Sequence, residues 1–237
     1  ETIASGRALE EHWSAAHGAE GLYGLREAFL RHHWEARRIV ERAAIRRSMA
    51  FASQADLVIA PGEGMRRFLV EQGVESPIVV LPTGVEVDLF APGDRALARR
   101  SLGLPPAGPI LLSVGRLDRE KSLDLLLTAF AHLATEIPEA RLLLVGQGKE
   151  AGRLRALGER LGRGDRICFL GGLPREALPG YYRAADLFLF TSQTETQGLV
   201  LAEAHACGIP AVAVRAPGAD ETVRDGETGL LTKPDPR

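Results

Sequence analysis

From Pro109 onward the chain alternates short apolar runs with longer amphipathic segments. The short runs have the length and composition of buried strands, and the longer segments have the apolar spacing of helices. Because parallel strands need a crossover connection, this alternation predicts a parallel sheet with helices on both faces. The predicted strands are 110–114, 142–145, 167–170, 187–190 and 211–214, and the predicted helices are 123–133, 150–161, 176–184 and 199–206.

Glycines and charged or polar residues follow four of the predicted strands. In an open parallel sheet, ligands bind beyond the carboxyl ends of the strands. The four loops are therefore expected to converge on one pocket, and a nucleotide is a fitting ligand for it. These loops contain Gly115-Arg116, Gly146-Gln147-Gly148, Gly171-Gly172 and Thr194-Glu195.

Two glutamates frame the loop and helix that follow the strand at 187–190. Glu195 precedes Gly198, which opens the helix, and Glu203 lies about a turn and a half inside it. The first amides of a helix have no partner within the helix and point at whatever lies in front of them, so they form a site for an anion. The alternative interpretation is a helix-start acid and a solvated surface acid.

A second strand, loop and helix segment runs from Ser113 to Ser122 and contains Arg116 and Lys121. A lysine at a helix start opposes the helix dipole, so an anion held between the lysine and the amides explains it better. The alternative is that Arg116 is a solvated cap and Lys121 the exposed flank of an amphipathic helix. The two segments together favour an anionic ligand.

These two segments resemble the donor site of the retaining family 4 glycosyltransferases, also called group 1 glycosyltransferases, of the GT-B fold. The resemblance runs in order from about Ala55 to the C-terminus. It implies an α/β chain with a Rossmann-like parallel-sheet donor domain and the C-terminal part of a second Rossmann-like, acceptor-binding domain. It also implies that Gly115, Arg116 and Lys121 hold the diphosphate of a nucleotide sugar.

The same resemblance assigns roles around the glutamate pair. Glu195 is implied to bind the hydroxyls of the donor sugar and Glu203 the ribose, which makes Arg116, Lys121 and Glu195 the expected catalytic residues. Backbone at the start of the helix is implied to bind the phosphate, and the turn after the strand at 167–170 to wall the base, although a plain strand-ending turn explains those glycines about as well. The positions are Gly198, Leu199 and Val200 for the phosphate, and Gly171 and Leu173 for the base.

The reaction implied is transfer of a hexose, with glucose as the expected sugar, from a UDP-sugar to a hydroxyl acceptor with retention at the anomeric carbon. No metal-ligand set is visible in the sequence. The charge growing on the diphosphate is therefore expected to be met by Arg116, Lys121 and helix amides, with no metal and no cofactor besides the co-substrate. Two alternatives stay open: a nucleotide-sugar epimerase or phosphorylase of similar architecture, and a fragment that binds a nucleotide sugar without turnover.

The expected acceptor is a lipid or a carbohydrate. The motif at Thr194–Gly198, with the segment Asp56–Pro61, most resembles the diacylglycerol glucosyltransferases. A predicted helix from about Leu22 to Phe51 is rich in arginine. The interpretation that we prefer is a solvated face over an apolar stripe buried in the protein, and the alternative is an apolar face that lies on anionic lipid. Adjacent His32 and His33 point to different sides of this helix, so no metal site is expected there.

Composition limits the partners of the chain. A net charge of −2 gives no pull toward nucleic acid, and no apolar run has the length to cross a bilayer. Cys168 and Cys207 lie in or beside apolar segments without metal-ligand spacing, which predicts reduced core residues. We therefore expect a cytoplasmic protein, with peripheral binding at the inner face of the cell membrane if the acceptor is a lipid.

The part of the chain before Pro109 has a different pattern. It predicts a strand at 57–60, a helix at 63–71, a strand at 78–81 and a linker at 82–92. The resemblance assigns residues 1–92 to the end of the acceptor-binding domain with the linker, and 93–237 to the nucleotide-sugar-binding domain. Because the chain begins at Glu1 and stops at Arg237, we expect a fragment that lacks the opening strands of the first domain and the last helices of the second.

Overall fold

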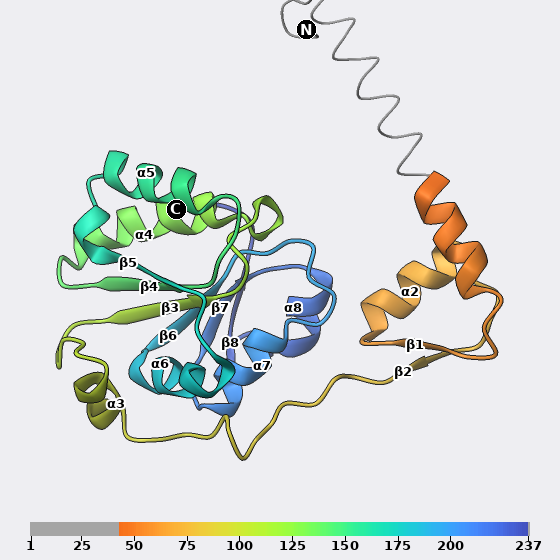
Figure 1. Ribbon diagram of the computed structural model, residues 1–237, viewed down its shortest axis with the longest axis horizontal. Coiled ribbons are helices and arrows are strands. Elements are labelled where there is room, and N and C mark those ends of the chain that lie inside the picture. The colour runs from red at the N-terminus through yellow and green to blue at the C-terminus, as the bar shows by residue number, and fades with distance from the viewer. Residues whose placement is uncertain (1–42, 237) are drawn as a thin grey trace, which may run out of the picture. The chain divides into compact units, whose positions relative to one another are not determined.

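The computed structural model describes residues 43–236, which form two compact units (Figure 1). One unit takes in the described residues up to Val58 together with Leu69–Pro77, and the other takes in Ile59–Phe68 and the chain from Ile78 onward. Residues 43–52 are helical, whereas the predicted helix between residues 22 and 42 lies outside the described residues. The elements that follow are β1 (Val58–Ala60), α2 (Glu63–Glu71) and β2 (Ile78–Val80), and they match the predicted elements to within one residue.

The second unit is built on a six-stranded parallel sheet. The order across the sheet is β5-β4-β3-β6-β7-β8, and each neighbouring pair is parallel. The chain runs outward from β3 to β5, returns to the other side of β3 at β6, and continues outward to β8. The strand order therefore reverses between β3 and β6, which is where open α/β sheets bind ligands. The strands are β3 (Ile110–Val114), β4 (Arg141–Val145), β5 (Ile167–Gly171), β6 (Leu187–Phe190), β7 (Ala211–Val214) and β8 (Gly229–Thr232).

Alternate side chains of the strands enter two separate cores, because successive residues of a strand point to opposite faces. Leu111 of β3 packs into the core under α4 and α5, whereas Ile110 and Leu112 pack into the core under α6, α7 and α8. The prediction of a parallel sheet with helices on both faces is therefore confirmed (Figure 1). The helices are α4 (Leu123–Glu136), α5 (Ala151–Arg160), α6 (Leu178–Ala184), α7 (Leu199–Ala206) and α8 (Pro217–Thr222).

Several short elements were not predicted from the sequence. Helix α3 (Arg95–Ser101) begins at Asp94, whose side chain accepts a hydrogen bond of 2.9 Å from the backbone of Leu97. Helix α8 and strand β8 are also additions to the predicted order. Three 3-10 turns complete the unit: η1 (Arg119–Lys121), η2 (Gly164–Arg166) and η3 (Arg175–Ala177).

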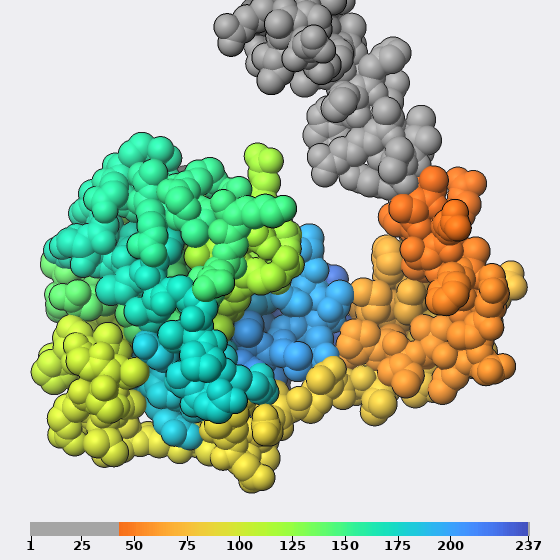
Figure 2. Space-filling model, viewed as in Figure 1, coloured from red at the N-terminus to blue at the C-terminus, as the bar shows by residue number. Residues whose placement is uncertain are grey.

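The segment from Pro82 to Pro92, called the linker below, belongs to the second unit. It lies along the surface of that unit beside α6 (Figure 2). Arg183 of α6 fixes it there by donating hydrogen bonds to the carbonyl oxygens of Leu89 (3.2 Å) and Ala91 (2.8 Å).

Both cysteines in the described part of the chain are free, Cys207 buried and Cys168 partly buried. Burial raises the pKa of the Cys207 thiol to about 11, so it stays protonated at neutral pH. Within residues 43–236 no helix combines the length and the apolar character needed to cross a membrane.

Candidate functional site

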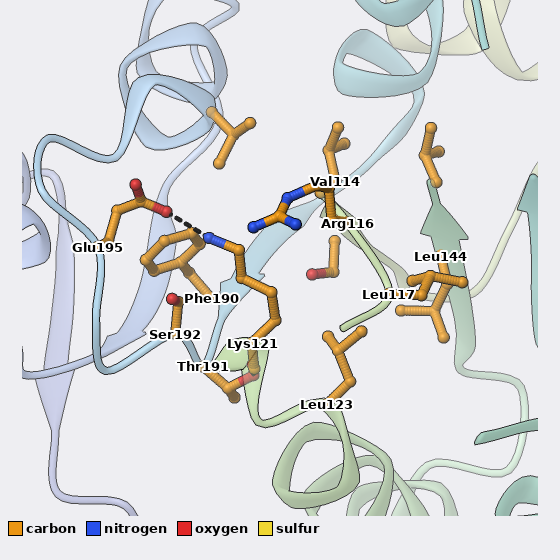
Figure 3. Close-up of a pocket in the computed structure, with 14 residues that line it drawn as sticks. Val114, Arg116, Leu117, Lys121, Leu123, Leu144, Phe190, Thr191, Ser192 and Glu195 are labelled. Atoms are coloured by element: carbon orange, nitrogen blue, oxygen red, sulfur yellow. Dashed lines mark hydrogen bonds and ion pairs between the residues drawn. The ribbon is translucent and has the colours of Figure 1, made fainter. Parts of the chain in front are cut away.

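The candidate site lies at the carboxyl ends of β3 and β6, where the strand order of the sheet reverses (Figure 3). A cavity of about 140 Å³ opens there. Pockets for complete small-molecule ligands usually measure about 300–1,000 Å³, so this cavity has room for part of a nucleotide sugar. It is lined by Ser113, Val114, Gly115, Arg116, Leu117, Lys121, Leu123, Leu144, Val145, Phe190, Thr191, Ser192, Glu195 and Val200.

Backbone hydrogen bonds join the loops that follow β3, β4 and β5. The amide of Leu117 donates to the carbonyl oxygen of Gln147 (2.8 Å), and the amide of Gly146 donates to that of Gly171 (2.7 Å). A Cβ atom on Gly146 would lie only 1.8 Å from the carbonyl oxygen of Gly115, and Gly146 has φ 144°. Close approach of the loops thus requires glycine at this position. The predicted convergence of these loops is present in the structure.

Lys121 and Glu195 form an ion pair inside the cavity (Figure 3). Lys121 Nζ lies 2.7 Å from Glu195 Oε2, and the two side chains are 19% and 23% exposed. Lys121 ends η1, just before α4, and its carbonyl oxygen accepts a hydrogen bond of 2.8 Å from Thr191 Oγ1. Because this pair is largely shielded, a diphosphate that binds Lys121 must compete with the Glu195 carboxylate for the ammonium group or share that group with it.

Arg116 faces the same space from the loop after β3. Figure 3 shows its guanidinium directed toward the Lys121 ammonium group. It pairs with Asp118 (2.7 Å) and with Glu120, but its side chain is 67% exposed. Exposed pairs of this kind contribute little free energy, so the guanidinium can turn toward an anion at small cost. Two cations thus face one cavity: Lys121 in a shielded ion pair and Arg116 with a largely exposed side chain.

Helix α7 begins at the left-handed Gly198 (φ 70°), as predicted. The loop before it is held by α8: the amide of Gly218 donates to Glu195 O (3.2 Å), and Thr222 Oγ1 donates to Gln197 O (2.8 Å). A Cβ on Gly218 would lie 2.7 Å from the amide nitrogen of Gln197, so this packing also requires glycine. The loop carrying Glu195 is therefore fixed by contacts from the next crossover.

Glu203 is a buried carboxylate with two partners. Its side chain is 6% exposed, and it accepts hydrogen bonds from Arg175 Nη1 (2.8 Å) and from the Tyr182 hydroxyl (3.0 Å). Burial, with the Glu203 charge adding to it, raises the pKa of Tyr182 well above its usual range, so this hydroxyl remains a donor. The interpretation of Glu203 as a solvated surface acid is wrong.

The structure separates the expected site residues into three groups. One group lines the cavity, one lies at the end of β5 and just after it, and one lies at the start of α7 and within it, outside the lining, with Leu199 exposed and Glu203 buried. The lining group is Gly115, Arg116, Lys121, Glu195 and Val200; the second is Gly171 and the partly buried Leu173; the third is Gly198, Leu199 and Glu203.

Two features of the site were not found from the sequence. Ser192 lines the cavity with its side chain almost fully buried, and its Oγ has no hydrogen-bond partner among residues 43–236. Arg175 and Tyr182 hold Glu203, although they lie in a different crossover. In the sequence, the only indication that Ser192 belongs to the site is its position between the strand at 187–190 and Glu195. In this described part of the chain no cluster of three or more His, Cys, Asp or Glu side chains has the arrangement of a metal site.

Two family models match the chain. Residues 94–236 match the model described as "Glycosyl transferases group 1", and residues 10–89 match "Glycosyltransferase Family 4". A D-inositol 3-phosphate glycosyltransferase of Acidothermus cellulolyticus is 44% identical over 163 residues, which cover 65% of this chain and 36% of that protein. The chain thus spans about a third of the length of this relative.

Solved structures agree with the sequence relatives. A sucrose-phosphate synthase from Thermosynechococcus elongatus superposes with a TM-score of 0.72 at 37% identity, over 79% of this chain and 47% of that one. Anabaena Alr3699/HepE in complex with UDP-glucose superposes with a TM-score of 0.74 at 29% identity, over 81% of this chain and 54% of that one.

Proposed function

This chain belongs to the group 1 glycosyltransferases, and on that basis we propose that its second unit binds a nucleoside diphosphate sugar whose hexose the complete protein transfers to a hydroxyl acceptor with retention. The observation that carries the proposal is the meeting of Arg116, Lys121 and Glu195 in one cavity at the reversal of strand order. Two cations suit a diphosphate, and a carboxylate suits sugar hydroxyls.

The proposed roles are those that the family resemblance implies, and the charges of the site support the role at the diphosphate. Negative charge grows on the diphosphate as the glycosidic bond breaks, and preorganised cations and helix amides stabilise that change more than they stabilise the bound donor. Arg116, Lys121 and the amides at the start of α7 take this role, without a metal ion or a further cofactor. Glu195 orients the sugar through its hydroxyls, and Glu203 accepts the ribose hydroxyls. Leu173 and Gly171 wall the base.

UDP-glucose is the donor that we propose first. The support is that the Alr3699/HepE structure, which covers most of this chain, is a complex with UDP-glucose. Transfer of a hexosyl group and retention at the anomeric carbon are proposed from the resemblance of the sequence motifs to the family.

Two classes of acceptor have support of different kinds. The D-inositol 3-phosphate glycosyltransferases among the relatives favour a phosphorylated polyol. The motif at Thr194–Gly198 favours a diacylglycerol and, with it, binding to the inner face of the membrane. The arginine-rich helix predicted at 22–51 also supports a lipid acceptor, but its residues 22–42 lie outside the described part of the chain. We propose the polyol phosphate first, because whole-sequence similarity covers more positions than one motif.

The test has a binding arm and a transfer arm. In the first, the chain is equilibrated with equimolar UDP-glucose, ADP-glucose and GDP-mannose, and the retained nucleotide is identified by mass spectrometry; we expect UDP-glucose. In the second, the complete protein receives UDP-glucose with D-inositol 3-phosphate or with diacylglycerol vesicles, and NMR reads the anomeric configuration of the product. An α-glucoside supports retention. In a parallel reaction that contains inorganic phosphate, UDP with glucose 1-phosphate as the only sugar product supports a phosphorylase. An isomerised sugar supports an epimerase, and no retained nucleotide contradicts the proposal.

A further inference from the structure

Glu203 belongs to a closed ring of four side chains in the second unit. Its carboxylate contacts Arg175 (2.8 Å) and the Tyr182 hydroxyl (3.0 Å). The Arg175 guanidinium lies over the Phe90 ring, 4.8 Å from its centroid, and Phe90 meets Tyr182 edge-on with centroids 5.8 Å apart. These four contacts form a closed ring, so Phe90 is connected to the Glu203 carboxylate both through Arg175 and through Tyr182.

Arg175 is the member of this ring that supplies positive charge. Glu203, Phe90 and Tyr182 are buried, whereas the Arg175 side chain is 48% exposed. A buried carboxylate needs a paired cation, and removal of that cation leaves a charge that nothing compensates. The tyrosine hydroxyl alone does not replace it, because it is neutral. The place of Glu203 therefore depends on Arg175.

Arg175 also connects this carboxylate to the linker. Phe90 is a linker residue, and its ring face receives the guanidinium, a favourable arrangement for a cation. A second linker residue, Glu86, lies 3.4 Å from Arg175 Nε, but its side chain is 64% exposed. Exposed pairs at this distance contribute little. The contact with Phe90 is thus the main tie between the linker and Glu203.

We propose that Arg175 is a positioning residue for nucleotide binding, which holds the Glu203 carboxylate in place for the ribose and keeps the linker residue Phe90 in the same ring. The inference rests on the proposed function, in which Glu203 accepts the ribose hydroxyls. Each carboxylate oxygen has about two acceptor sites. Arg175 occupies one oxygen and Tyr182 the other, so one site on each oxygen remains for a hydroxyl, and the carboxylate cannot rotate between them.

The test compares UDP with 2′,3′-dideoxy-UDP by calorimetry on the whole chain. Because Arg175 acts through Glu203, Arg175→Ala should weaken UDP binding about tenfold or more and dideoxy-UDP binding by less than about twofold. Arg175→Lys should recover part of the lost UDP affinity. Phe90→Leu should lower the ratio of UDP affinity to dideoxy-UDP affinity, as Arg175→Ala does, but by a smaller factor. Glu86→Gln is the matched control, since it alters only the exposed contact of Arg175, and it should leave both affinities within about twofold.

Three outcomes decide between the ideas. Suppose first that the wild type binds UDP more tightly than dideoxy-UDP. The positioning role is then overturned if Arg175→Ala weakens the binding of both nucleotides equally, or weakens the binding of neither. If Arg175→Ala does not fold by circular dichroism, Phe90→Leu gives the same comparison, and an unchanged ratio overturns the role. A wild type that binds both nucleotides equally contradicts the ribose assignment of Glu203 in the proposed function and this inference with it.

Discussion

Replacing Glu195 with glutamine should affect a nucleotide and its sugar conjugate in opposite directions. Glu195 holds Lys121 at 2.7 Å, with both side chains largely shielded from solvent. Glutamine keeps the shape but removes the charge that competes with a diphosphate for Lys121. If the pair stabilises the structure by about 1 kcal/mol, UDP should bind up to about fivefold more tightly to the variant.

UDP-glucose should instead bind less tightly to the same variant. Its sugar hydroxyls lose a charged acceptor, and each such hydrogen bond contributes about 1.5–3 kcal/mol. Subtracting the gain of about 1 kcal/mol at Lys121 leaves a net loss of about 0.5–2 kcal/mol if one hydrogen bond is removed. The ratio of the two affinities should therefore change by about 10- to 150-fold, which calorimetry with both ligands measures directly.

Glu139→Gln is the matched control for this prediction, because it makes the same charge change at an exposed position outside the cavity lining. It should leave the ratio unchanged. Equal losses of UDP and UDP-glucose affinity in Glu195→Gln, with an unchanged thermal midpoint, would refute the assignment of Glu195 to the sugar.

Three further substitutions test the scaffold. Gly146→Ala places a Cβ 1.8 Å from Gly115 O and should lower the free energy of unfolding in urea by about 2–4 kcal/mol, whereas Gly152→Ala, which meets nothing within 4 Å, should not lower it; equal effects would contradict the close approach of the loops. Ser122 has φ 50°, so Ser122→Gly should raise that free energy by about 0.5–1 kcal/mol while Ser122→Ala should not; a loss in Ser122→Gly would count against strain there. Burial lowers the pKa of His205, so the unfolded chain binds the proton more readily than the folded chain. The free energy of unfolding should therefore fall as the pH drops below about 6.5, and His205→Gln should make this fall less steep. An equally steep fall in the variant would contradict the prediction.

The sequence predicted the sheet well because its strands are short, apolar and separated by turn residues. Strands β3, β6 and β7 and helix α7 have the predicted bounds, and Gly198 opens α7 as expected. Helix α8 was missed because six residues that include a proline and a glycine show no helical period. Helix α3 was missed because three of its seven residues are arginines and its buried residues are Ala98 and Arg99, which do not form an apolar stripe. The Asp94 cap is its clearest signal in the sequence.

The site was partly predictable for a topological reason. Parallel strands put their carboxyl ends at one edge, so Lys121 and Glu195 were expected near each other, and the structure joins them. The surroundings of Glu203 were not predictable, because the pairing of one buried side chain with Arg175 and Tyr182 depends on how α6 and η3 pack against α7. Helical spacing around Glu203 describes only its own helix. The buried Oγ of Ser192 likewise becomes informative only when its lack of a partner is known.

The central claim is that Arg116 and Lys121 hold the diphosphate of a nucleotide sugar. The most direct measurement is calorimetric titration of UDP into the wild type and into the double variant Arg116→Ala/Lys121→Ala. Arg160→Ala/Arg224→Ala serves as the control, because it also removes two positive charges, both of them exposed and outside the cavity lining. Because the first variant cannot form two charge-assisted hydrogen bonds to the diphosphate, its UDP affinity should fall at least about a hundredfold, while that of the control should stay near the wild-type value. Equal affinity of the wild type and the Arg116→Ala/Lys121→Ala variant would contradict the claim.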